Sequence, residues 1–199
     1  MLKANWGWQG NARTLRHRGE YLLKHLPLPA DVTFEFENDG VTENIPAHKF
    51  MLAIGSEVFY AMFFGPAANT TQTTVAIANY PKQIFEALIA FLYADQKPNF
   101  AGGKKAEIAT VVLQLLQCAT QYGVPELAKH CRAEILNSLR VRGQINVCSL
   151  LTQARLLEEE IECGALDEID RHPLAALKKQ DLTDVSVDMM VEILRRSQN

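Results

Sequence analysis

The sequence has few groups that could bind a metal or form a disulfide, and those it has are scattered. Its four cysteines, Cys118, Cys131, Cys148 and Cys163, include no Cys-x-x-Cys pair. None of the five histidines forms a metal-binding pattern with a histidine or cysteine three or four residues away. Zinc sites and redox dithiols depend on such spacings. We therefore expect no metal, no other cofactor and no disulfide.

The sequence also lacks a strong charge imbalance and a long hydrophobic run. A net charge of −3 gives no general attraction to nucleic acid or to an anionic membrane, so neither is expected as a partner. The apolar run at residues 87–94 is far too short to span a bilayer, and no secretory hydrophobic segment follows Met1. We expect reduced thiols and a location in the cytoplasm, with the nucleus as a second location.

Catalytic groups at useful spacings are absent as well. His130 and Cys131 are adjacent, so on a helix their side chains point about 100° apart and make a poor base and nucleophile. Gly103-Lys104 lacks the earlier glycine and the following hydroxyl residue of a phosphate-binding loop. The glutamates at 158–160 are interpreted as a solvated connection between helices. We expect that the chain is not an enzyme.

What the sequence does contain is hydrophobic periodicity. Apolar residues at helical spacing in residues 11–26 predict a leading helix, which Pro27 ends. Apolar and polar residues alternate strictly in residues 32–37, a pattern that predicts a strand with one buried face. The turn residues at 38–40 then predict a hairpin whose second strand is Val41–Ala47.

The stretch IPAHKFMLAIGSEVFYAMFFG predicts a central helix from His48 to Phe64. Its apolar positions cover more of the helix surface than one packing partner needs. One stripe consists of Phe50, Ile54, Val58 and Met62, and the stripe is widened by Leu52, Phe59 and Phe63. We expect this helix to be buried on more than one side.

The remaining pattern predicts mostly helices. Residues 73–77 alternate as a third short strand, and Pro81 begins a helix that leads to a loop at residues 95–105. Helices are then predicted at residues 108–119 and 125–139, followed by shorter ones at 147–157, 163–177 and 186–196. The pattern indicates an α+β part followed by an all-α part.

Asp31 and His48 are predicted to have a structural polar role. His48 lies where a strand passes into an apolar helix. Its ring is expected either to cap backbone groups or to meet Asp31 at the start of the first strand.

Several segments, in this order and spacing, resemble the BTB (POZ) domain: ADVTFEF, IPAHKFMLAIGSEVFYAMF, YPKQIFEALIAFLYAD and CATQYGVPELAKHC. The resemblance covers about residues 15–139. The later run NVCSLLTQARLLEEEIECGALDEIDRHPLAAL resembles the opening helices of a BACK domain. The leading NWGWQGNARTLRHRGEYLL and the run LLTQARLLEEE are most similar to BTB-BACK proteins that continue into a PHR domain.

The resemblance implies a BTB/POZ fold, a helical cluster capped by a small sheet, at residues 1–142. It implies the beginning of a BACK domain at 143–199. In the family the leading helix packs across a two-fold axis onto the central helix of a second copy, which implies a homodimer. The implied dimer-interface residues are Leu15, Leu22, Leu23, Leu26, Met51 and Leu52.

The resemblance also implies binding to the cullin-3 scaffold. The positions that match this surface are Phe63, Phe64, Tyr93, Asp95, Val112 and Gln114. Many cullin-3-binding members carry a three-residue pattern near the start of the helix after the fourth strand. The pattern is a hydrophobic residue, any residue and then an acid. Here Val112-Leu113-Gln114 is the best match and has no acid, while the alternative Lys105-Ala106-Glu107 lacks the large hydrophobic residue.

These implications give two functional hypotheses. The first is a non-enzymatic, homodimeric adaptor of a cullin-3 RING ubiquitin ligase, with its substrate protein recognised by a C-terminal domain absent from this chain. The second is a BTB dimer that serves as a transcriptional or structural assembly module without a cullin. The BACK-like segment favours the first, because BTB transcription factors usually continue into a linker and DNA-binding fingers.

Overall fold

The computed structural model describes residues 28–38, 40–69, 71–98, 105–140, 147, 150–151, 159–171 and 187–196. The chain divides into two compact units. The first combines Met1–Pro98 with Cys118–Leu127, and the second combines Asn99–Gln117 with Ala128–Asn199. The predicted leading helix at residues 11–26 lies outside the described residues, and the predicted domain division after residue 142 stays a prediction.

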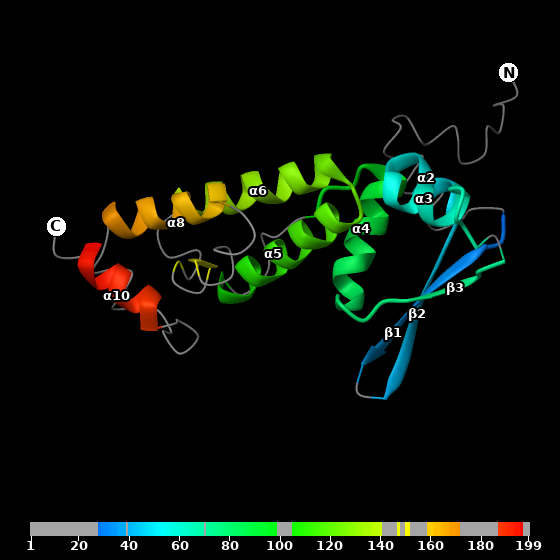
Figure 1. The fold of residues 1–199 in the computed structure, drawn as a ribbon, viewed down its shortest axis with the longest axis horizontal. Coiled ribbons are helices and arrows are strands. Elements are labelled where there is room, and N and C mark those ends of the chain that lie inside the picture. Colours follow the sequence, from blue (N-terminus) through cyan, green and yellow to red (C-terminus); the bar gives the residue numbers. More distant parts are fainter. Residues whose placement is uncertain are drawn as a thin grey trace, which may run out of the picture. The chain divides into compact units, whose positions relative to one another are not determined.

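The hairpin predicted from the alternating residues is confirmed. Strands β1 (Val32–Asn38) and β2 (Val41–Ala47) pair antiparallel, with Val32 opposite Ala47 and Asn38 opposite Val41 (Figure 1). Val32, Phe34 and Phe36 are buried on one face of β1. Gly40 in the turn has a φ of 77°, a conformation that glycine adopts without the strain of a side chain.

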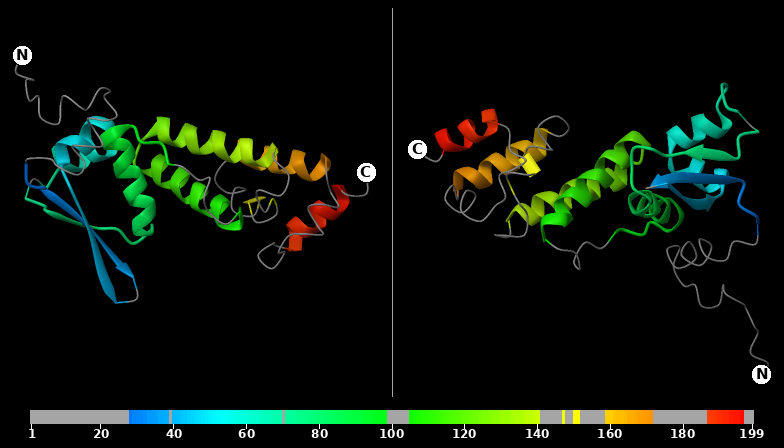
Figure 2. Two further views of the ribbon diagram at one scale, coloured as in Figure 1. Left: turned by 180° about the vertical axis from the view of Figure 1, so that it is seen from behind. Right: turned by 90° about the horizontal axis from the view of Figure 1, so that it is seen from below.

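A third strand completes the sheet on the other edge of β1. β3 (Thr74–Ala76) pairs parallel to β1, so the strand order is β2-β1-β3. Figure 2 shows the same three strands from two further directions. A parallel neighbour requires the chain to cross back before it pairs, and two helices form this crossover.

The central helix is interrupted, which corrects the prediction of one continuous helix at residues 48–64. α2 (Lys49–Gly55) ends before Ser56, and α3 (Glu57–Phe64) begins after it. Ser56 is extended, with φ −148° and ψ 120°, and its Oγ accepts a hydrogen bond from Phe59 N at 3.0 Å. The same hydroxyl donates to the carbonyl of Tyr122. Ser56 therefore caps α3 and ties the break to another part of the unit.

α4 (Lys82–Ala94) completes the first unit and packs against α2. It follows Pro81, as the sequence predicts, and ends at Asp95, whose φ of 50° is in the left-handed region. Aromatic rings form the centre of the unit. The ring centroids of Phe34 and Phe85 lie 4.7 Å apart, and those of Phe59 and Tyr122 lie 4.9 Å apart.

The second unit is helical. Its elements are the first part of α5 (Lys105–Gln121), most of α6 (Pro125–Arg140), α8 (Glu159–Arg171) and α10 (Val187–Arg196). α8 begins at Glu159, earlier than the predicted residue 163, so the glutamates at 159 and 160 are helical and do not form a connection. Residues 147, 150 and 151 of the predicted helix 147–157 are helical, and the rest of that helix lies outside the described residues.

Close packing holds α8 against α6 within this unit. A Cβ placed on Gly164 would lie 2.9 Å from Leu136 Cδ2, closer than side-chain atoms normally approach. α10 packs on α8 and buries Ile193 fully. No helix among the described residues combines the length and the apolar character needed to cross a membrane.

Candidate protein-interaction surface

The α2–α3 segment has two apolar faces, and only one is buried. Leu52, Phe59 and Phe63 are at most 2% exposed and belong to the core. In contrast, Phe50 is 66% exposed, Ile54 68% and Val58 37%. These last three residues are called the outer stripe below. Large apolar side chains that gather on one surface segment mark an interaction site more often than a monomer surface.

A second exposed feature of α3 is an aromatic pair. Tyr60 is 57% exposed and Phe64 is 50% exposed, and their ring centroids lie 6.2 Å apart. The two residues are four positions apart, so they share one side of the helix. Phe63 points to the opposite side, where its ring stacks on Phe59 at 5.9 Å and lies 5.6 Å from the ammonium group of Lys49.

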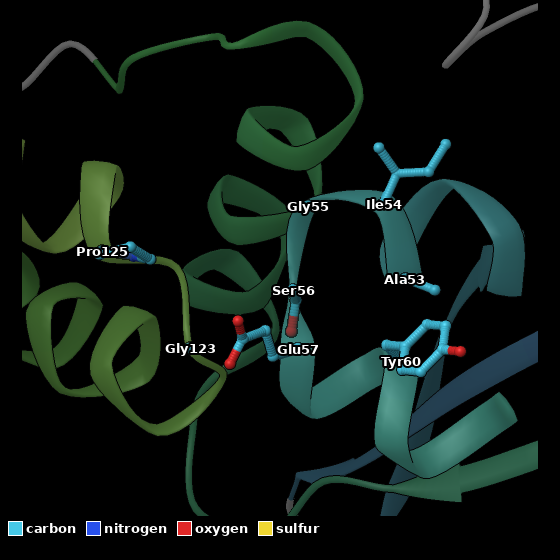
Figure 3. Close-up of a pocket in the computed structure, with 8 residues that line it drawn as sticks. All are labelled: Ala53, Ile54, Gly55, Ser56, Glu57, Tyr60, Gly123 and Pro125. Carbon is cyan, nitrogen blue, oxygen red and sulfur yellow. The ribbon is translucent and has the colours of Figure 1, made fainter. Parts of the chain in front are cut away.

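A hollow of about 590 Å³ opens where α2 gives way to α3 (Figure 3). It is lined by Ala53, Ile54, Gly55, Ser56, Glu57, Tyr60, Gly123 and Pro125. Glu57 is the one charged residue of this lining, and its carboxylate points toward the Gly123 turn. Because Ile54 and Tyr60 both line the hollow, it joins the outer stripe to the aromatic pair.

His48 and Tyr93 form a polar contact beneath the other end of α2. The Tyr93 hydroxyl accepts a hydrogen bond from His48 N at 2.8 Å and also lies 2.8 Å from His48 Nδ1. His48 Nε2 lies 3.0 Å from the carbonyl oxygen of Leu28. Asp31 does not meet the His48 ring through a hydrogen bond. Its carboxylate accepts from Lys49 N at 2.7 Å instead.

Burial of the Tyr93 hydroxyl raises its pKa to about 12, and the carboxylate of Asp31 acts in the same direction, while the bond from His48 N opposes them. Tyr93 is therefore a neutral donor and acceptor at physiological pH. In this geometry the partners of Asp31 and His48 are backbone groups and Tyr93, and the structural polar role of the two residues stays a prediction.

Only two of the six predicted dimer-interface residues belong to the part of the chain that the structure describes. Leu15, Leu22, Leu23 and Leu26 lie outside the described residues. Met51 is half-buried, and Leu52 is 0% exposed. Leu52 therefore belongs to the core and leaves no side-chain surface for a second copy.

The predicted cullin-3-binding residues differ in how much of each is exposed to solvent. Phe64 and Asp95 are exposed, whereas Phe63 and Tyr93 are buried in the first unit. In the second unit Val112 is buried and Gln114 is half-buried. Because Phe63, Tyr93 and Val112 are buried, their side chains offer little area to a partner.

The sequence pattern groups Phe50, Ile54 and Val58 in one stripe of the predicted central helix, but neither these residues nor Tyr60 are among the predicted site residues. Phe50 and Ile54 are four residues apart on α2, and this spacing is the signal that could have grouped them. Val58 follows the break between α2 and α3, so helical spacing does not place it with them. Tyr60 is four residues before Phe64, so helical spacing could have predicted that the two side chains lie on the same side of the helix.

The described part of the chain offers no alternative chemical centre. No cluster of three or more histidine, cysteine or acidic side chains within it could hold a metal ion. Cys118 and Cys131 are buried and Cys163 is exposed, and none of these three described cysteines forms a disulfide. Burial raises the pKa of Cys131 to about 12, so its nucleophilic thiolate is not populated at neutral pH.

A sequence model described as the BTB/POZ domain matches residues 22–139. The chain belongs to the BTB/POZ domain family. BTB/POZ domain-containing protein 6-B of Danio rerio is 34% identical over 191 residues, which are 95% of this chain and 37% of that protein. Human BTB/POZ domain-containing protein 3 is 33% identical over 190 residues, 95% of this chain and 34% of that protein. The chain therefore spans about a third of the length of these relatives.

Among solved structures, the BTB domain of zebrafish PATZ1 is similar over 62% of this chain and 94% of its own length, with 18% identity and a TM-score of 0.43. The family match confirms the predicted α+β BTB fold, in which a three-stranded sheet accompanies mostly helices. As a BTB domain, the chain is a protein-protein interaction module of a family that is generally non-enzymatic.

Proposed function

We propose that this BTB domain is a homodimeric, non-enzymatic substrate adaptor of a cullin-3 ubiquitin ligase, with substrate recognition by a domain outside this chain. The observation that carries the proposal is the two-sided α2–α3 segment. Leu52, Phe59 and Phe63 are buried in the core, while Phe50, Ile54 and Val58 remain exposed. A second copy is the partner that the family resemblance implies for the exposed side of this segment.

The energetics favour an isologous arrangement. A large apolar side chain gains about 1.5–3 kcal/mol when it moves from water to a buried position. A two-fold axis buries each outer-stripe residue twice, once in each copy. The three outer-stripe residues of each copy would together form the hydrophobic centre that is typical of homodimer interfaces.

Ile54→Asp tests the dimer. The substitution places an unpaired carboxylate at the proposed interface of both copies, which costs several kcal/mol per copy, and we expect a monomer at micromolar concentration. Val187→Asp is the matched control, because Val187 is 78% exposed and lies on α10 in the other unit. Light scattering gives the mass, and circular dichroism checks that each variant is folded. A monomeric unmodified chain, or a folded Ile54→Asp dimer, would contradict the proposal.

Exposed Phe64 and Asp95 support the cullin-3 part of the proposal, since they match the family's scaffold-binding positions. Interface energy is usually concentrated in a few aromatic side chains, and Phe64 is the exposed aromatic among these positions. We expect Phe64→Ala to weaken binding by about 2 kcal/mol or more, roughly thirtyfold.

The measurement is calorimetry of the intact chain against the N-terminal region of cullin-3. Val41→Ala is the control, because Val41 is 63% exposed on β2, away from α3 in sequence. A verified dimer that releases no heat at high micromolar concentration would favour the second function instead. That function is a BTB dimer acting as an assembly module, and the absence of an acid at Gln114 is the observation in its favour.

A further inference from the structure

His48 connects three parts of the first unit through its ring and its backbone. Its backbone N–H donates to the Tyr93 hydroxyl on α4, its Nδ1 faces that same hydroxyl, and its Nε2 faces the carbonyl of Leu28 before β1. The two ring contacts are 2.8 Å and 3.0 Å long. These contacts involve none of the outer-stripe residues.

The partners of the ring select one form of the imidazole. A carbonyl oxygen can only accept, so Nε2 must carry a hydrogen and donate it to Leu28. Nδ1 is then the acceptor of a neutral ring, and the Tyr93 hydroxyl donates to it while accepting from His48 N–H. All three bonds form together only when His48 is neutral and protonated at Nε2.

We propose that His48 and Tyr93 form a proton-sensitive latch between α4 and the chain that enters β1. When the ring gains a proton, Nδ1 becomes a donor and can no longer accept from Tyr93. The Tyr93 hydroxyl is then left without an acceptor in a side chain that is 7% exposed. Because an unsatisfied buried hydroxyl is unfavourable, the hydroxyl turns toward water and its bond to His48 N–H is lost.

Among the described residues, the titratable side chains next to the latch include Asp31 and Lys49. Asp31 lies at the start of β1 and holds Lys49 N, and Lys49 directs its ammonium group over the Phe63 ring. Tyr93 itself has a raised pKa of about 12 because of burial, so it stays protonated across the range in which a histidine titrates. The proton that opens the latch is therefore the one bound at Nδ1 of His48.

Nitrogen NMR of the ¹⁵N-labelled chain tests the latch without any substitution. When the His48 ring is neutral we expect the tautomer with hydrogen on Nε2. When the ring is protonated we expect exchange of the His48 amide to become about fivefold faster after correction for the intrinsic pH dependence, the factor of one lost hydrogen bond. A neutral ring protonated at Nδ1, or an amide exchange rate that protonation leaves unchanged, would overturn the proposal.

Tyr93→Phe removes the hydroxyl and keeps the ring. In this variant the His48 amide should exchange rapidly at every pH, and the pH dependence seen in the unmodified chain should vanish. Tyr80→Phe is the matched control, because the Tyr80 hydroxyl bonds to Gln121 and not to the latch. Retention of the pH-dependent exchange in Tyr93→Phe would show that Tyr93 is not the acceptor that responds to the proton.

Discussion

At the scale of single residues, Tyr93 differs from Phe64, another aromatic residue at a predicted cullin-3 position, because Tyr93 is buried. Its match to a partner-binding position suggests a contact residue, yet its hydroxyl is held by His48 and its side chain is buried. Phe64 has the opposite environment, exposed on α3 beside Tyr60. Tyr93 therefore helps to fix the position of α4 through its hydroxyl, whereas half of Phe64 is exposed to solvent on α3.

Tyr93 is expected to make the free energy of unfolding depend on pH in the alkaline range. The pKa of Tyr93 in the folded state, about 12, lies above the usual tyrosine value of about 10, so the folded state favours the protonated phenol. The stabilisation is complete below pH 10 and is lost as pH rises from 10 to 12, because the unfolded chain releases this proton first. We expect the free energy of unfolding to fall more steeply over that range in the unmodified chain than in Tyr93→Phe. Parallel curves from denaturant titrations would contradict this expectation.

At the scale of elements, the break between α2 and α3 determines which apolar residues are buried. Ser56 lies between the end of α2 and the start of α3. Its hydroxyl accepts a hydrogen bond from Phe59 N of α3 and donates one to the Tyr122 carbonyl. Leu52 before the break and Phe59 after it both reach the core. The break also creates the hollow lined by Ile54 and Tyr60.

Ser56→Ala should destabilise the first unit by about 1–3 kcal/mol. The change removes the cap of α3 and leaves the Tyr122 carbonyl without its hydroxyl donor. Thr71→Ala is a suitable control, because the Thr71 hydroxyl bonds locally to Asn69 on an exposed loop and should matter by less than about 0.5 kcal/mol. Urea unfolding followed by circular dichroism compares the two. Equal midpoints for both variants would show that Ser56 does not anchor the break.

The sequence predicts most of these elements but not their long-range contacts. Alternation at Val32, Phe34 and Phe36 predicts β1, because a strand turns every second side chain to the same face. The break at Ser56 was not predicted, since apolar positions continue at helical spacing on both sides of it. A glycine, then a serine cap and an acid at Glu57 form the local signal that could have located it. The bond between His48 and Tyr93 joins residues 45 positions apart, and no local pattern encodes it.

At the scale of the whole molecule, the proposed dimer links stability to concentration. If folding and association are coupled, dilution favours the unfolded monomer. We expect the melting temperature to rise by about 1.5–3 °C for each tenfold increase in protein concentration, since that increase is worth about 1.4 kcal/mol per dimer, or about 0.7 kcal/mol per chain. Differential scanning calorimetry at several concentrations measures the slope. Ile54→Asp should remove it, and a slope of zero in the unmodified chain would exclude coupled dimerisation.

The parallel pairing of β3 with β1 also has a consequence for how the protein emerges from the ribosome. β2 pairs with β1 as soon as the hairpin is made, but β1 waits about forty residues for its second neighbour, while α2 and α3 are synthesised. At about 5–20 residues per second, that interval lasts roughly 2–8 s. During it, one edge of β1 has unpaired backbone groups, the kind of edge that other nascent chains can join. Translation speed across the crossover is therefore expected to influence the yield of soluble protein.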